Sequence, residues 1–185
     1  MKKTGIILII IAVLILGWVW TSYNKLVTSN ESVDSSWAQV ETQYQRRFDL
    51  IPNLVNAVQG VMDQEDEIFL KIAEARSKYA GASTTNEKAA AAGQVESALG
   101  RLLVVMENYP TLKSAETVQN LMTQLEGTEN RISVARTRYN DEVKMFNTRI
   151  KRVPMNLIAS WFNFDEKNYF ESVEEATAPP TVNFE

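Results

Sequence analysis

Apolar residues fill the start of the chain without interruption and afterwards recur only every three or four positions. The uninterrupted run covers residues 5–20, GIILIIIAVLILGWVW, and contains no charged side chain. An α-helix rises about 1.5 Å per residue, so this run with its flanks spans the ~30 Å apolar core of a bilayer. We therefore predict a transmembrane helix over about residues 5–22, and its span includes Gly5, Ile10, Leu14, Trp18 and Trp20.

The same run also resembles the start of a cleaved secretory signal, because Lys2 and Lys3 precede it. However, Trp18 and Trp20 stand where a signal peptidase requires small residues, and the chain has no cysteine to carry a lipid. Aromatic side chains of this kind are favoured at a water–lipid boundary. A retained single-pass anchor over residues 1–22 is therefore the interpretation that we prefer.

The charges on either side of the run predict its orientation. Lys2, Lys3 and the amino terminus precede it, whereas Lys25 is the only base between the run and Arg46. Since flanks richer in bases stay in the cytoplasm, the N-terminus is predicted to be cytoplasmic. The remainder of the chain then lies on the outer side of the membrane.

From residue 33 onwards the apolar residues follow the 3.6-residue period of a helix. Pro52 is expected to kink the first of these helices, because proline lacks the backbone donor. The pattern around Gly60 fits either a turn or one bent helix that continues to Tyr79. No narrow apolar stripe can bury itself alone, so residues 23–152 predict an all-α fold: an antiparallel bundle of three to four long helices behind the N-terminal transmembrane helix.

Local signals predict where the later helices begin and end. A polar loop leads to an N-cap at Thr85 or Asn86, and Pro110 ends the helix that follows. The last long helix is expected to be capped near Thr111 or Ser114.

The chain changes character after Pro154, which is expected to stop the last long helix. Residues 153–173 are rich in aromatic side chains and predict a short helix and a turn. Residues 174–185 lack periodicity and predict a disordered tail. The aromatic side chains are expected to cap the base of the bundle or to touch lipid headgroups: Trp161, Phe162, Phe164, Tyr169 and Phe170.

Charge and composition exclude several classes of function. Without Lys2 and Lys3 the remaining chain carries 17 bases and 23 acids, which disfavours nucleic acid as a partner. The chain has no histidine and no cysteine, so it lacks the usual zinc ligands, a thiol nucleophile and an imidazole base. We therefore expect no catalytic activity, no metal and no cofactor. A Ser–Lys pair remains the formal exception, and nothing in the spacing of its candidate serines supports it: Ser35, Ser36, Ser97 and Ser114.

The densest polar cluster lies beside Pro52 and comprises Arg46, Arg47, Asp49 and Asn53. Arginine forks bind carboxylates and phosphates, so this cluster is our candidate partner-binding surface. The favoured alternative is structural. In it, an arginine pairs with acids on neighbouring helices, while the aspartate and asparagine satisfy backbone groups that Pro52 frees.

Long blocks of the sequence resemble the LemA family of bacterial membrane proteins. These blocks are YNKLV (23–27), QRRFDLIPNLVNAVQG (45–60), ALGRLLVVMENYPTLKS (98–114), ARTRYNDEVKMFNTRI (135–150) and VPMNLIASWFNF (153–164). The resemblance implies a single N-terminal anchor and a helical bundle, and it implies no established biochemical activity. Two departures stand out: Gln64 replaces a histidine of many relatives, which weakens any metal site there, and Asn163 replaces a common glycine.

Two hypotheses about function follow. The first is a non-catalytic scaffold or adaptor of the bacterial inner membrane, bound to the lipid bilayer through its N-terminal helix. It contacts envelope or membrane proteins through helix faces and forms homo-oligomers. Relatives are often encoded near membrane metalloproteases, so quality control with such a protease is the role that the resemblance favours.

The second hypothesis is a sensory bundle that binds a small ligand between its helices and works with a membrane partner. Asn53, Asn140 or an arginine would orient that ligand. Asn140 also has a structural explanation, because an amide at the edge of an apolar stripe commonly fixes helix register.

Overall fold

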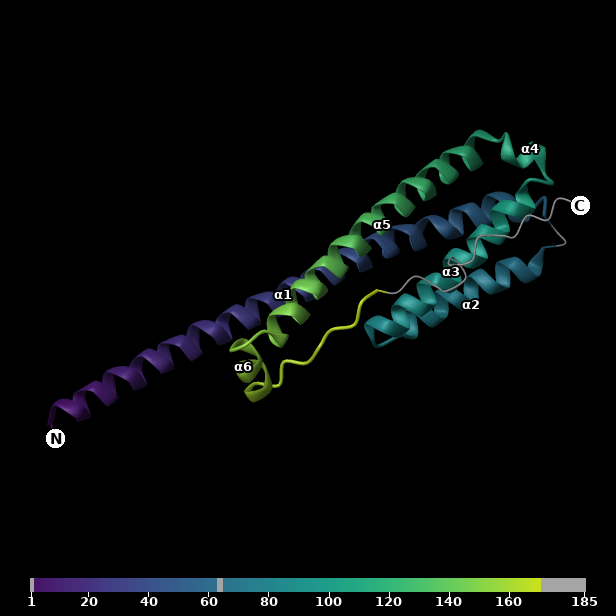
Figure 1. Ribbon diagram of the computed structural model, residues 1–185. Helices are drawn as coiled ribbons and strands as arrows, with labels where there is room; N and C mark the ends of the chain where they lie inside the picture. The colour runs from purple at the N-terminus through teal and green to yellow at the C-terminus, as the bar shows by residue number, and fades with distance from the viewer. Residues whose placement is uncertain (1, 63–64, 171–185) are drawn as a thin grey trace, which may run out of the picture. The chain divides into compact units, whose positions relative to one another are not determined.

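The computed structural model describes residues 2–62 and 65–170, and all regular structure within them is helical. The predicted all-α fold is therefore confirmed for these residues, whereas the predicted disordered tail lies outside them. The helices are α1 (Lys2–Gln59), α2 (Asp66–Gly81), α3 (Thr85–Met106), α4 (Pro110–Lys113), α5 (Glu116–Lys151) and α6 (Met155–Trp161) (Figure 1).

The chain divides into two compact units. Unit 1 comprises Met1–Val40 and Ala135–Tyr169, and unit 2 comprises Glu41–Val134 and Phe170–Glu185. The long helices α1 and α5 each contribute residues to both units. The region 23–152, which the periodicity predicts as the bundle, therefore supplies residues to both units.

Unit 2 is a helical bundle to which α1, α2, α3 and α5 all contribute buried side chains. Glu41 on α1 pairs with Lys88 on α3, and Arg47 pairs with Glu96 about two turns further along both helices, so α1 and α3 run parallel. The hairpin of α2 and α3 makes its two helices antiparallel. Side chains with almost no exposed surface form the core: Ile51, Leu54, Val58, Ile72, Val95, Leu102, Met106 and Ile132.

The helix boundaries in unit 2 answer two questions that the sequence leaves open. A turn follows Gln59, in which the amides of Val61 and Met62 both donate to the carbonyl of Val58, so α1 does not continue to Tyr79. The N-cap of α3 is Thr84, one residue before the predicted position. Its hydroxyl accepts from the Glu87 amide, and the Glu87 carboxylate accepts from the Thr84 amide; this reciprocal bonding fixes the start of the helix.

The last long helix, α5, begins at Glu116, slightly later than predicted, because the chain first forms the short helix α4. Proline is well suited to the first turn of a helix, where its missing donor has no intrahelical partner. Pro110 opens α4 in this way. Pro52, in contrast, lies inside α1, which continues as a helix on both sides of it.

In unit 1, α1 and α5 run antiparallel. The Trp37 and Tyr139 rings lie 5.3 Å apart between centroids, and Arg149 Nη1 donates to the Lys25 carbonyl oxygen at 3.3 Å, so position rises on one helix as it falls on the other. Buried positions on α1 recur every four and three residues, and serines alternate with aliphatic residues among them: Ser22, Leu26, Ser29, Val33, Ser36 and Val40. Side chains as small as serine let a neighbouring helix approach closely.

The segment after α5 completes unit 1. The short helix expected in the aromatic-rich region is α6, which buries Ile158 and Ala159. Asn163 follows α6 with φ 56°, a left-handed conformation that asparagine and glycine tolerate better than other residues. Residues 162–169, here called the C-terminal strap, then extend along α1 and α5 (Figure 1).

The C-terminal strap is attached by specific hydrogen bonds. The Asn147 amide donates from Nδ2 to the Lys167 carbonyl at 2.8 Å and accepts the Lys167 amide hydrogen on Oδ1 at 2.9 Å. The Tyr139 hydroxyl donates to the Asn168 carbonyl at 2.9 Å. The Phe164 ring lies within 6.4 Å of the Phe146 ring, measured between centroids. Asn147, rather than the predicted Asn140, is thus the buried amide of α5.

Candidate functional site

The predicted membrane-spanning residues all lie in the first third of α1. Side chains of the apolar run are exposed in the absence of a membrane, and none of its most hydrophobic window is buried against protein. The helix is therefore a candidate membrane span, as predicted. α3 is also long and apolar enough to cross a membrane, but almost half of its apolar window is buried in unit 2, where Val95 and Leu102 belong to the core.

Arg47, from the predicted partner-binding cluster, points into unit 2 and joins three helices. Its Nη1 atom lies 2.6 Å from Oε2 of Glu129 on α5 and 3.4 Å from Oε1 of Glu96 on α3. The Tyr44 hydroxyl donates to the same Glu96 oxygen at 3.3 Å. Only 9% of the Arg47 side chain is exposed, so this residue follows the structural alternative: it pairs with acids on neighbouring helices.

Arg46, Asp49 and Asn53 have a different environment, because all three are exposed on α1. Steps of three and four residues place them in one line along the helix, and we call them the α1 polar stripe. Gln45 Nε2 donates to Asp49 Oδ1 at 2.9 Å, so the aspartate bonds to a side chain one turn earlier. The predicted cluster therefore separates into one buried arginine and a polar stripe that is accessible to a partner.

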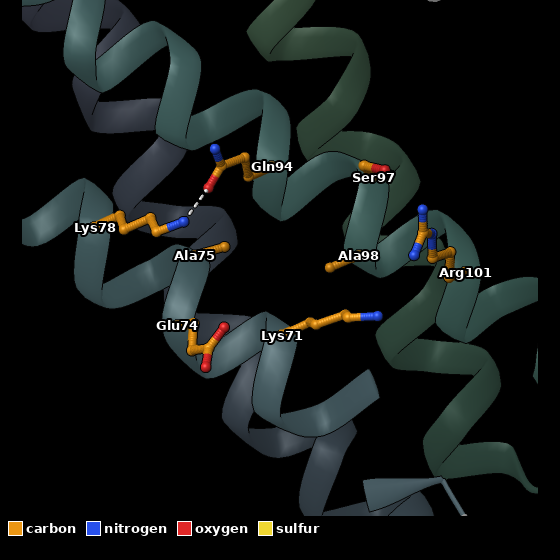
Figure 2. Close-up of a pocket in the computed structure, with 8 residues that line it drawn as sticks. All are labelled: Lys71, Glu74, Ala75, Lys78, Gln94, Ser97, Ala98 and Arg101. Atoms are coloured by element: carbon orange, nitrogen blue, oxygen red, sulfur yellow. Dashed lines mark hydrogen bonds between the residues drawn. The ribbon is translucent and has the colours of Figure 1, made fainter. Parts of the chain in front are cut away.

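A second candidate surface is a shallow groove of about 220 Å³ between α2 and α3, which the sequence analysis did not identify. The small side chains of Ala75 and Ala98 leave space there, and Lys71, Lys78 and Arg101 surround it (Figure 2). Although the chain is acidic overall, these three cations outnumber the one acid of the groove, Glu74. The groove thus has the charge and size to hold a small anion.

Hydrogen bonds already occupy two of these cations. Lys71 pairs with Glu67 one turn away, and this bond together with the lysine charge lowers the pKa of the Glu67 carboxyl. Lys78 Nζ donates to Gln94 Oε1 at 3.1 Å, as Figure 2 shows. The helical spacing of Lys71 and Lys78, seven residues apart, is the sequence signal that predicts their common face.

The candidate serines of a Ser–Lys pair lie in different places. Ser36 is buried and donates to the Val33 carbonyl, and Ser114 donates to the Thr111 carbonyl. Ser97 lines the α2–α3 groove together with Lys71 and Lys78 (Figure 2). Both lysine ammonium groups are bonded to the acceptors named above, which leaves the groove better suited to binding than to proton abstraction.

Acidic side chains are spread over the helices. Among residues 2–62 and 65–170, no group of three or more carboxylates converges in a geometry that could hold a metal ion.

Comparison with known proteins gives the chain its family. The model of the LemA family matches residues 36–184. Magnetosome protein MamQ 2 of Paramagnetospirillum magneticum is 27% identical, over 85% of this chain and 67% of its own length. Magnetosome protein MamQ of Magnetospirillum gryphiswaldense is 26% identical over the same shares. Protein LemA of Metamycoplasma hominis is 22% identical over 82% of this chain and 69% of its own length. The family model covers most of the residues after the apolar run, and the chain therefore belongs to the LemA family.

Proposed function

We propose that this protein is a non-catalytic, membrane-anchored scaffold or adaptor whose helix faces bind other membrane or envelope proteins. The observation that carries the proposal is the separation of roles within the predicted cluster. Arg47 forms ion pairs inside unit 2, whereas the side chains of the α1 polar stripe are exposed and remain accessible to a partner. An arginine, a carboxylate and an amide in one line offer charged and neutral hydrogen bonds to a second helix.

The names of the relatives agree with an assembly role. MamQ 2 and MamQ are named as magnetosome proteins, that is, by a cellular structure and not by a reaction. The partners that we propose are membrane or envelope proteins, with a membrane protease as the specific candidate for quality control. Self-association through the bundle or the anchor is part of the same proposal.

A site-specific crosslinker tests the proposed partner surface. A photoreactive amino acid at Asn53 should give discrete adducts in intact cells, because this position lies on the α1 polar stripe. The matched control is Gln124, which is exposed on α5 in unit 2. Arg46→Glu should abolish the Asn53 adducts and Arg46→Lys should keep them. Equal adducts at both positions, or adducts that are insensitive to Arg46→Glu, would contradict the proposed surface.

We also propose that the helical units lie on the extracytoplasmic side of the bacterial inner membrane, because Lys2 and Lys3 precede the span. The chain has no cysteine, so one introduced thiol reports its location without background. Ser77→Cys places that thiol at an exposed site on α2. A membrane-impermeant maleimide should label it in spheroplasts without lysis. Labelling that requires lysis would place the units in the cytoplasm.

The α2–α3 groove favours a second candidate function, the binding of a small anionic ligand. Asn53 is exposed on α1 and lies outside this groove, so Arg101 replaces it as the orienting residue. Inorganic phosphate should then raise the thermal unfolding temperature of the wild type, because a ligand that binds only the native state stabilises it. Arg101→Gln should remove this increase. An unchanged unfolding temperature at saturating phosphate would count against phosphate binding.

A further inference from the structure

One end of unit 1 exposes several large apolar side chains of a kind that proteins usually bury. Val153, Leu157, Trp161 and Phe162 are 80, 54, 69 and 46% exposed, respectively. Leu157 and Trp161 are four residues apart and therefore share one face of α6. Ile158 in the same helix is fully buried, so α6 presents apolar side chains both to the interior of unit 1 and to its surface.

This apolar face is continuous with the end of the candidate membrane span. The centroid of the Phe162 ring lies 4.7 Å from that of Tyr23. Tyr23 follows Trp20, the last residue of the apolar run, by three residues, or about 4.5 Å along a helix. Burial against protein begins at Ser22, so the packed part of unit 1 starts directly at the end of the span. α6 lies beside this part of α1 (Figure 1).

Exposed bases lie next to the same end of unit 1. Lys25 is two residues beyond Tyr23, and the bond from Arg149 to the Lys25 carbonyl brings the end of α5 to this level. Arg149 and Arg152 line a surface hollow that Val153 also borders. In a chain with an excess of acids, these bases are gathered at the end where the membrane begins.

We propose that Lys25, Arg149, Arg152, Val153, Leu157 and Trp161 form a membrane-contact surface that binds anionic phospholipids of the bilayer that α1 enters. The order from the apolar run through the rings of Tyr23 and Phe162 to Lys25 and Arg149 matches the order of hydrocarbon, interface and phosphate in a bilayer leaflet. Apolar residues of α6 enter the boundary between headgroups and acyl chains, and the arginine forks bind lipid phosphates. This contact attaches unit 1 to the membrane at a second place and is independent of the proposed scaffold function.

Depth measurements on the full-length protein test the apolar part. A nitroxide on Leu157→Cys, in nanodiscs of phosphatidylcholine with phosphatidylglycerol, should be accessible to oxygen and shielded from a water-soluble nickel chelate. A nitroxide on Ser77→Cys in unit 2 is the aqueous control. Leu157 is exposed, so its replacement should leave the helical circular dichroism unchanged. A label at residue 157 that behaves as the control would overturn the proposal. Shielding from both reagents would identify a protein, and not lipid, as the occupant.

A matched pair of arginine variants tests the ionic part. One base near an anionic membrane surface contributes about 1 kcal/mol, or about fivefold in partitioning. Phosphatidylglycerol should increase the depth of the nitroxide at residue 157 in the bilayer, and Arg152→Gln should reduce this increase. Arg138→Gln removes the same charge from an exposed site on α5, about 16 Å further along the helix from Arg149, and should not change it. Equal immersion with and without phosphatidylglycerol would overturn the headgroup contact.

Discussion

In unit 2, α1, α2, α3 and α5 supply the core, whereas in unit 1 two helices depend on a segment that follows them in the chain. Unit 2 ties its helices together with the pairs of Arg47 to Glu96 and Glu129. Unit 1 instead uses edge-to-face contact between the Trp37 and Tyr139 rings and hydrogen bonds from side chains to the C-terminal strap. Two helices bury only one seam between them, so a third layer is needed to cover it.

The two units also differ in their content of tryptophan. All four tryptophans, Trp18, Trp20, Trp37 and Trp161, belong to unit 1. Tryptophan fluorescence therefore reports on unit 1 alone, while far-ultraviolet circular dichroism reports on the helices of both units. A variant that affects one unit selectively should move one signal before the other.

The largest effect is expected from Arg47→Ala in unit 2. Removal of the arginine leaves two acids without their cation, and because those acids keep some contact with water we expect a loss of about 3 kcal/mol in the free energy of unfolding. Urea titration followed by circular dichroism measures it. Arg46→Ala, at the exposed neighbouring position, should change stability by less than about 0.5 kcal/mol. Equal effects of the two variants would mean that the buried pair does not stabilise unit 2.

Asn147→Ala should give the next largest effect, and in unit 1. The substitution removes both hydrogen bonds to the Lys167 backbone and leaves half-buried groups unsatisfied, which costs about 2 kcal/mol. Tryptophan fluorescence during urea titration should show the loss. Met145→Ala, two residues earlier and half exposed on the same helix, is the control. A fluorescence midpoint that matches the wild type would show that the strap does not stabilise unit 1.

Replacement of tyrosine by phenylalanine should change the free energy of unfolding in opposite directions in the two units. The Tyr139 hydroxyl donates to the strap, so Tyr139→Phe should lose about 1 kcal/mol. The buried Tyr79 hydroxyl has no hydrogen-bond partner among the described residues, so Tyr79→Phe should gain about 1 kcal/mol. Thermal unfolding of both variants, followed by the two signals, measures the difference. Loss of stability in both variants would show that the Tyr79 hydroxyl is satisfied in solution.

The last expected effect is confined to alkaline pH. Burial, and after it the charge of Glu41, raises the pKa of Tyr79 from 10.0 to about 12. A raised pKa means that the native state binds the proton more tightly than the unfolded state. The contribution of this proton to the free energy of unfolding is therefore complete below pH 10 and declines as the pH approaches 12. The stability of unit 2 should fall over this interval, and Tyr79→Phe should fall less. Parallel curves for the two proteins would contradict the shift.

Several features of the fold could be predicted from the sequence because they depend on neighbours within one or two turns. The apolar run, the helical period and the prolines at residues 110 and 154 specify the long helices and most of their ends. The N-cap at Thr84 was missed by one residue, since Thr84, Thr85 and Asn86 can all cap a helix and only the bond to Glu87 distinguishes them.

The candidate site was less predictable. Arg46 and Arg47 are adjacent and chemically alike, but one helical step turns their side chains about 100° apart. Which of them enters unit 2 depends on where α3 and α5 place Glu96 and Glu129. No pattern in the chain predicts that Asn147 bonds to a residue twenty positions later, because an extended strap has no periodicity of its own.

The sequence by itself determined the all-α class, the candidate membrane span and membership of the LemA family, because composition, period and residue order are properties of the chain alone. Only the tertiary structure decided that α1 and α5 are shared by two units, and that Arg149 and α6 meet the end of the span. Those contacts join residues more than a hundred positions apart. Nothing local encodes them, since they exist only where burial of several distant apolar faces is satisfied at once.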